Sequence, residues 1–111
     1  MTTLSIARQF SMYPGGRFKR ISEYSGEEFR DKLLIPALNE DGKVIVDLDG
    51  VVGYGSSFLE EVFGGLVRAM RWISRTDVDT RLQLKSTQSS WLQEANQYID
   101  DELRRQRSLA N

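Results

Sequence analysis

The chain contains no cysteine and no histidine among its 111 residues. Without cysteine it forms no disulfide bond and carries no thiolate nucleophile. Without histidine it lacks the usual general base, the commonest metal ligand and the usual switch at physiological pH. These two absences disfavour catalysis, so we expect a protein that is not an enzyme and needs no cofactor.

Excess charge and long apolar runs are missing as well. The formal net charge is −1, which gives no reason to expect a nucleic-acid partner. No run of about 18 apolar residues exists, and the first residues lack the basic start and apolar stretch of a secretory signal. We therefore expect a cytoplasmic protein without a membrane segment. A length of 111 residues with 40% hydrophobic content is typical of one folded domain.

Apolar residues recur along most of the chain with the spacing of regular secondary structure. Alternating or continuous apolar residues predict strands, and a recurrence every three or four positions predicts helices. Ser25 and Ser90 each precede Glu or Gln three residues later, which is typical of a helix start. Residues 1–3 and 108–111 are expected to fray. The expected strands cover residues 4–10, 17–21, 43–48 and 81–85. Three helices are expected: one that starts after Ser25, one over residues 58–72 and one over residues 91–105.

Several details of the pattern concern the sheet. Pro14-Gly15-Gly16 predicts a turn that makes a hairpin of the first two strands. The continuous run Val44–Val46 predicts a strand buried on both faces. Gly64 and Gly65 cost about 1 kcal/mol each inside a helix, which usually marks close packing against a sheet. The alternation of strands and helices predicts a single α/β domain, with a mixed sheet of about four strands and three helices mainly on one face.

The segment most informative about function covers residues 43–65. Its strand ends in Asp47 and Asp49, a glycine-rich turn follows, and Ser56 and Ser57 then open a helix. Hydroxyl groups at a helix start can bind phosphate, accept a phosphoryl group or only cap the helix. Ser57 forms a capping-box pattern with Glu60, which is a purely structural explanation for this serine and predicts a mild loss of stability in Ser57→Ala.

The glycines and aspartates of this segment allow further interpretations. Gly50, Gly53 and Gly55 fit neither a Walker nor a dinucleotide-binding pattern, and no lysine follows them, so they predict a turn. Asp47 and Asp49 lie on the same side of the strand end, where carboxylates can bind Mg²⁺. The alternative is that the aspartate beside Gly50 only forms the turn.

Residues 47–57 resemble the signature of STAS domains, the fold of bacterial anti-sigma-factor antagonists. The resemblance runs without a gap from Asp-Leu-Asp-Gly at Asp47 to the serine pair, defined here as Ser56 and Ser57. Gly-Ser-Ser-Phe-Leu-Glu-Glu-Val-Phe-Gly is similar, more closely still, to the STAS-like family of unknown function DUF4325. The chain departs from the antagonists at Gly55, where they carry an acid, and at Phe58, where they carry glycine.

The resemblance implies a single STAS-like domain that acts as a regulatory protein-interaction module. In the antagonists a partner kinase phosphorylates the second serine of the pair, so the implied phosphorylation candidates are Ser57 and, beside it, Ser56. The implied partner is an anti-sigma-type ATPase of the histidine-kinase class. A phosphate there would meet Glu60, Glu61 and Asp49, and the switch would then work by repulsion.

The partner is expected to contact the turn of residues 50–57 and the exposed side of the following helix. Tyr54 stands among the glycines and is expected at the exposed tip of the turn. There it would be a candidate partner contact, because tyrosine is favoured in interface hot spots. Two functions from other classes remain open. One is a small enzyme or binding domain that holds Mg²⁺ or phosphate, and the other is a homodimeric structural protein without a switch. The candidate contact residues are Asp49, Gly53, Tyr54, Gly55, Phe58 and Glu61.

Overall fold

The fold was analysed in a computed structural model that describes residues 1–110. Within these residues three strands form one sheet and the helical residues form five stretches, two of which contain a π-helical segment (η). The strands are β1 (Thr2–Ser5), β2 (Val44–Asp47) and β3 (Leu82–Lys85). The helices are α1 (Ile6–Gln9), α2–η1–α3 (Gly26–Phe29, Arg30–Leu34, Ile35–Glu40), α4–η2–α5 (Ser56–Leu59, Glu60–Gly64, Gly65–Met70), α6 (Arg75–Asp79) and α7 (Ser89–Ala110).

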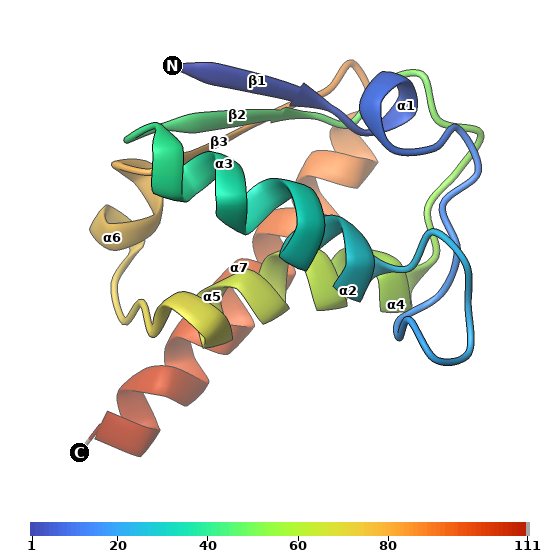
Figure 1. The fold of residues 1–111 in the computed structure, drawn as a ribbon. Helices are drawn as coiled ribbons and strands as arrows, with labels where there is room; N and C mark the ends of the chain where they lie inside the picture. Colours follow the sequence, from blue (N-terminus) through green and yellow to red (C-terminus); the bar gives the residue numbers. More distant parts are fainter. Residues whose placement is uncertain (111) are drawn as a thin grey trace.

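The sheet is parallel throughout, in the order β1–β2–β3, and the three long helical stretches lie on one of its faces (Figure 1). Val44 and Val46 point toward the helices and are fully buried, whereas Ile45 on the opposite face is partly exposed. The prediction that this strand is buried on both faces is therefore wrong. Successive side chains alternate across a strand, and within residues 1–110 no long helix covers the second face.

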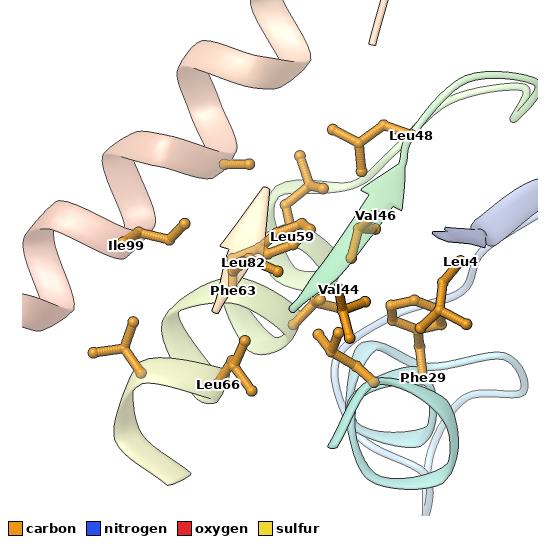
Figure 2. Packing of buried hydrophobic residues seen from close by; sticks show 14 of the residues in the cluster. Leu4, Phe29, Val44, Val46, Leu48, Leu59, Phe63, Leu66, Leu82 and Ile99 are labelled. Carbon is orange, nitrogen blue, oxygen red and sulfur yellow. The ribbon is translucent and has the colours of Figure 1, made fainter. Parts of the chain in front are cut away.

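The core fills the space between the sheet and the long helices. Figure 2 shows Val44 and Val46 of β2 facing aromatic and aliphatic side chains from all three helical stretches. Burial of such side chains stabilises the fold by about 1.5–3 kcal/mol each. The labelled core residues are Leu4, Phe29, Val44, Val46, Leu48, Leu59, Phe63, Leu66, Leu82 and Ile99.

The predicted hairpin over residues 4–21 is wrong. The Ser5 hydroxyl accepts a hydrogen bond from the backbone N–H of Arg8 (3.2 Å), which caps α1 and ends the strand. Residues 10–25 then form an irregular segment, the N-terminal loop, whose backbone groups bond within the loop and to α2. The Gly15 N–H donates to the Tyr24 carbonyl (2.8 Å). The sheet consequently has three parallel strands instead of four mixed ones, and the helical stretches number five instead of three.

The helix starts agree with the sequence in one case and differ in others. Ser25 caps α2 by accepting from the Glu28 N–H (3.1 Å), as predicted. Ser90 is not a cap, because α7 already begins at Ser89. A helix start that the sequence analysis did not identify is that of α6, which has a reciprocal capping box between Ser74 and Asp77.

The helical stretch continues through Pro36, which lies in the first turn of α3. The π segment η1 ends at Leu34, two residues before the proline, and its wide turn bonds the Ile35 N–H to the Arg30 carbonyl. This turn leaves room for the proline ring, which would collide with a carbonyl in a regular helix.

The chain ends are regular within the described residues. Thr2 and Thr3 belong to β1 and residues 108–110 continue α7, where fraying was expected, while Asn111 lies outside the described residues. Across residues 1–110, the helices are too short or too polar to cross a membrane.

Candidate functional site

The serine pair opens α4, and both serines are exposed. Gly55 occupies the capping position, and among residues 1–110 no side chain caps this helix. The predicted capping box is wrong, because the Glu60 carboxylate accepts hydrogen bonds from Arg17 and Arg68 instead of from the Ser57 N–H. The Ser57 hydroxyl therefore does not cap this helix.

This correction changes the expected effect of removing the hydroxyl group. We expect Ser57→Ala to change the free energy of unfolding by less than about 0.5 kcal/mol. Ser74→Ala is the matched control, because Ser74 does cap a helix, and it should cost about 1 kcal/mol. Urea unfolding of both variants and the wild type measures the difference. Equal losses in the two variants would show that Ser57 caps α4 in solution.

Tyr54 holds the turn in place instead of standing at its tip. Its hydroxyl donates to the Leu48 carbonyl (2.7 Å), and its ring lies against Phe58 and Trp91, with centroid distances of 5.7 and 4.9 Å. Burial, together with the charges of Asp47 and Asp49, raises the pKa of the Tyr54 hydroxyl well above its ordinary value. The expectation of an exposed tyrosine is therefore wrong.

Asp49 joins the ends of two neighbouring strands. Its carboxylate accepts from the Ser86 hydroxyl (2.7 Å) and from the Thr87 N–H (2.9 Å). These hydrogen bonds, that from Ser86 first, hold the pKa of Asp49 below its ordinary value. Asp47 accepts from the Asp49 N–H (3.0 Å), as in an Asx turn. Within the described residues, no group of three or more acidic side chains could hold a metal ion.

Two of the other predicted contact residues are exposed and two are buried. Gly53 and Gly55 lie at the surface beside the serine pair. Phe58 is a fully buried core residue, and Glu61 is only 7% exposed. Phe58 therefore offers no exposed surface to a partner and Glu61 offers little, contrary to the expectation that both lie on the exposed side of the helix.

The exposed part of the turn lies beside the N-terminal loop. The Val52 N–H donates to the Met12 carbonyl (3.0 Å), so the two segments run side by side at the end of the molecule that carries α1 (Figure 1). Val52 and Tyr13 are about seven-tenths exposed and Met12 is half exposed. Sequence reasoning missed Met12 and Tyr13, because about 40 residues separate them from the turn.

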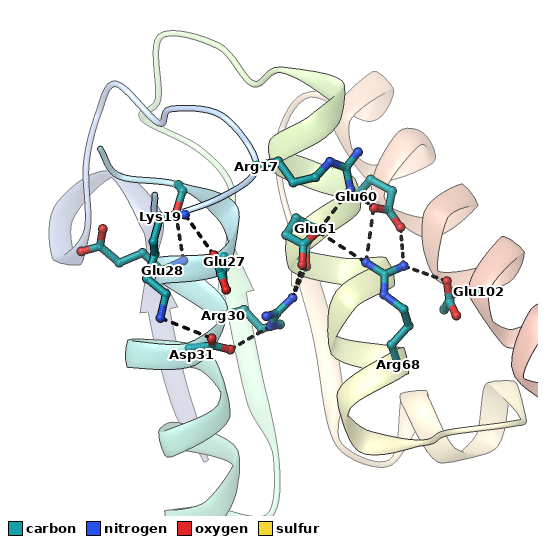
Figure 3. Close-up of polar contacts among 11 residues, drawn as sticks. Arg17, Lys19, Glu27, Glu28, Arg30, Asp31, Glu60, Glu61, Arg68 and Glu102 are labelled. Atoms are coloured by element: carbon teal, nitrogen blue, oxygen red, sulfur yellow. Dashed lines mark hydrogen bonds and ion pairs between the residues drawn. The ribbon is translucent and has the colours of Figure 1, made fainter. Parts of the chain in front are cut away.

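Both glutamates that follow the serine pair belong to a network of ion pairs (Figure 3). Arg17 from the N-terminal loop pairs with Glu60 and Glu61. Arg30 from η1 pairs with Glu61. Arg68 from α5 pairs with Glu60 (2.8 Å) and with the buried Glu102 of α7 (2.8 Å). The arginine network, as we call it, comprises Arg17, Arg30, Arg68, Glu60, Glu61 and Glu102.

The network neutralises the acids that were expected to repel a phosphate. Burial raises the pKa of Glu60, but hydrogen bonds from Arg68 and Arg17 outweigh it, so the pKa lies below its ordinary value. The carboxylate is therefore ionised at neutral pH and balanced by its arginines. Repulsion by Glu60 and Glu61 is thus no longer expected to dominate at Ser57.

Gly64 and Gly65 provide the space that the network occupies. A Cβ atom at Gly64 would collide with the Glu60 carboxylate, and one at Gly65 would collide with the Arg30 guanidinium. The interpretation of this pair as packing against the sheet is therefore wrong. The two glycines were the only sequence signal of the network, and they did not identify its members.

The π segment η2 aligns the network along α4–η2–α5. An α-helix turns by about 100° per residue, so Arg68, eight positions after Glu60, would point about 80° away from it. A π turn takes up about one additional residue. That extra residue brings Arg68 back beneath Glu60, where the 2.8 Å ion pair forms.

Comparison with known proteins agrees with this architecture. The model of the STAS-like domain of unknown function (DUF4325) matches residues 25–91, which is more than half of the chain. No curated protein and no solved structure matches the chain. The matched segment contains β2, the serine pair and most of the arginine network. The chain belongs to the STAS-like family DUF4325.

Proposed function

We propose that this protein is a regulatory protein-interaction module whose control point is the serine pair. The observation that carries the proposal is that Ser56 and Ser57 are both exposed and that neither side chain caps the helix it opens. A kinase can therefore reach either hydroxyl without unfolding the site. The gapless resemblance of residues 47–57 to anti-sigma-factor antagonists supports an ATP-binding kinase of the histidine-kinase class as the partner.

The modification that we propose is an ordinary phosphoryl transfer. The serine Oγ forms a bond to the γ-phosphorus of ATP while the bond from that phosphorus to the β-phosphate oxygen breaks. ADP leaves, and the hydroxyl proton passes to a base of the kinase. The product carries close to two negative charges and three strong acceptor oxygens. This is a large local change in a protein whose net charge is −1.

The partner surface that fits this function combines the turn with the N-terminal loop. Met12, Tyr13 and Val52 expose apolar side chains next to the glycines that precede the serine pair. Exposed apolar side chains that lie together favour a protein contact. A phosphate at the edge of such a contact would have to be desolvated when the partner binds, which weakens the phosphorylated complex selectively.

The experiment is to express the tagged protein in the cells from which the sequence comes and to map phosphate by mass spectrometry. We expect one phosphoryl group on the peptide that contains the serine pair, and its loss in S56A/S57A. The matched control is S89A/S90A, because Ser89 and Ser90 form a second exposed serine pair at a helix start. That variant should keep the phosphate. No phosphate, or phosphate lost only in S89A/S90A, would refute the proposal.

A further inference from the structure

Arg17 is placed where it can bind a phosphate on Ser57, and this inference rests on the proposed phosphorylation of the serine pair. We propose that Arg17 is the internal phosphate-binding residue of this protein. It would leave part of its contact with the two glutamates and donate hydrogen bonds to phosphorylated Ser57. The phosphate would then be held against the N-terminal loop, which carries Met12 and Tyr13.

The first argument is the position of Ser57 on its helix. Residues three and four positions apart on a helix are neighbours, with Cβ atoms about 5–6 Å apart. Ser57 precedes Glu60 by three residues and Glu61 by four, so its side chain lies between theirs, one turn earlier. Arg17 contacts both of these glutamates. Figure 3 shows that it reaches the helix on the N-terminal side of Glu60, which is the side of Ser57.

The second argument is the number of hydrogen-bond donors that Arg17 has to spare. An arginine side chain carries five N–H donors in a planar fork that matches two phosphate oxygens. Within residues 1–110, the hydrogen bonds of Arg17 to both glutamates come from Nη1 alone. Its side chain is 31% exposed, so Nε and Nη2 are not sealed in the core.

The third argument is that the network tolerates the loss of Arg17. Glu60 retains Arg68 at 2.8 Å, and Glu61 retains Arg30. The costly way to break a buried ion pair is to leave one charge buried without a partner. This does not happen when Arg17 turns toward the phosphate, because both carboxylates keep another arginine. Arg30 and Arg68 lack this freedom. The Arg30 side chain is only 13% exposed, and Arg68 makes the closer ion pair to the buried Glu102, at 2.8 Å against 3.5 Å for Arg105.

The geometry also distinguishes the two serines. Ser56 is one residue, or about 100°, away from Ser57 around the helix. Its hydroxyl faces Tyr98 of α7, where it lowers the pKa of the tyrosine against the larger opposing effects of burial and Glu94. A phosphate on Ser56 would therefore point toward α7, and Arg17 should affect it much less than a phosphate on Ser57.

The test uses protein in which phosphoserine is encoded genetically at position 57, so that no kinase is needed. The readout is the ³¹P chemical shift of the phosphate as a function of pH. A neighbouring arginine favours the dianion, so Arg17 should lower the pKa of the phosphate relative to R17Q by at least about half a pH unit. R20Q is the matched control, because Arg20 lies in the same loop with its guanidinium over the Phe18 ring and does not belong to the arginine network.

The expected pattern is a lowered phosphate pKa in the parent protein and in R20Q, its loss in R17Q, and a weaker effect of R17Q with phosphoserine at position 56. R17K is a second variant for the case that R17Q folds poorly, because lysine keeps the charge but lacks the planar guanidinium fork. R17K should lower the pKa of the phosphate less than arginine does. Equal titration curves for the parent, R17Q and R17K would overturn the inference. Absence of phosphate in cells would instead refute the proposed function and leave this measurement valid.

Discussion

Replacing Glu61 with glutamine should lower the free energy of unfolding by about 3 kcal/mol. Glu61 is only 7% exposed, and three arginines surround its carboxylate: Arg17, Arg30 and Arg68. The Arg30 side chain is itself only 13% exposed. An amide of the same shape removes the negative charge and leaves these guanidinium groups facing one another at low dielectric, which is the costly way to break a buried ion pair.

Urea unfolding followed by circular dichroism measures this effect, and the melting temperature should fall by about 13 °C. Glu28→Gln is the matched control, because Glu28 pairs at 3.6 Å with a Lys32 side chain that is 65% exposed. Exposed pairs contribute less than about 1 kcal/mol. If E61Q and E28Q cost the same, the network is open to water and does not stabilise the contact between the helices.

Replacing Gly26 with alanine should cost about 2 kcal/mol, although alanine is the better helix former. Gly26 is the first residue of α2, and a Cβ atom there would lie 2.7 Å from the Phe58 carbonyl oxygen and 3.1 Å from the Glu61 Cβ. The first of these is a backbone atom of a helix whose Phe58 side chain is fully buried. The two helices must therefore move apart for the methyl group to fit.

Gly53→Ala is the matched control with the opposite expected sign. A Cβ atom at Gly53 meets nothing within 4 Å, so the substitution should be neutral or stabilise by about 0.5 kcal/mol through the unfolded state. Chemical denaturation of both variants gives the comparison. Loss of less than about 0.5 kcal/mol in G26A would mean that α2 and α4 separate easily, contrary to their close contact in the structure.

Local sequence pattern was sufficient for the elements that carry their own signals. The Val-Ile-Val run identified β2, the alternation in residues 81–85 identified β3, and Ser25 with its following glutamates identified the start of α2. The first strand was overextended because Ser5 caps a helix without the usual acid three residues later. Gln9, four residues later, takes the reciprocal role by accepting from the Ser5 N–H (2.6 Å).

The candidate site was predictable in place but not in detail. The sequence identified the serine pair, and the structure shows both serines exposed. The sequence did not reveal which group donates to the Glu60 carboxylate, because the competing donors were the nearby Ser57 amide and Arg17, 43 residues away. Phe58 and Glu61 were expected on an exposed flank, but helices and the N-terminal loop pack against the helix on several sides. Such choices depend on contacts that are distant in sequence.

The π turn in η2 fixes how relatives of this protein must space their charges. A relative that keeps the extra residue of this turn needs its arginine eight positions after its glutamate, as Arg68 follows Glu60 here. A relative that has lost one residue within this segment has an uninterrupted α-helix, and its arginine aligns with the glutamate at seven positions, about two full turns. Loss of the extra residue by itself shortens the spacing from eight positions to seven, so no other change is needed to keep the ion pair, and the spacing of the two charged residues reports the backbone geometry between them.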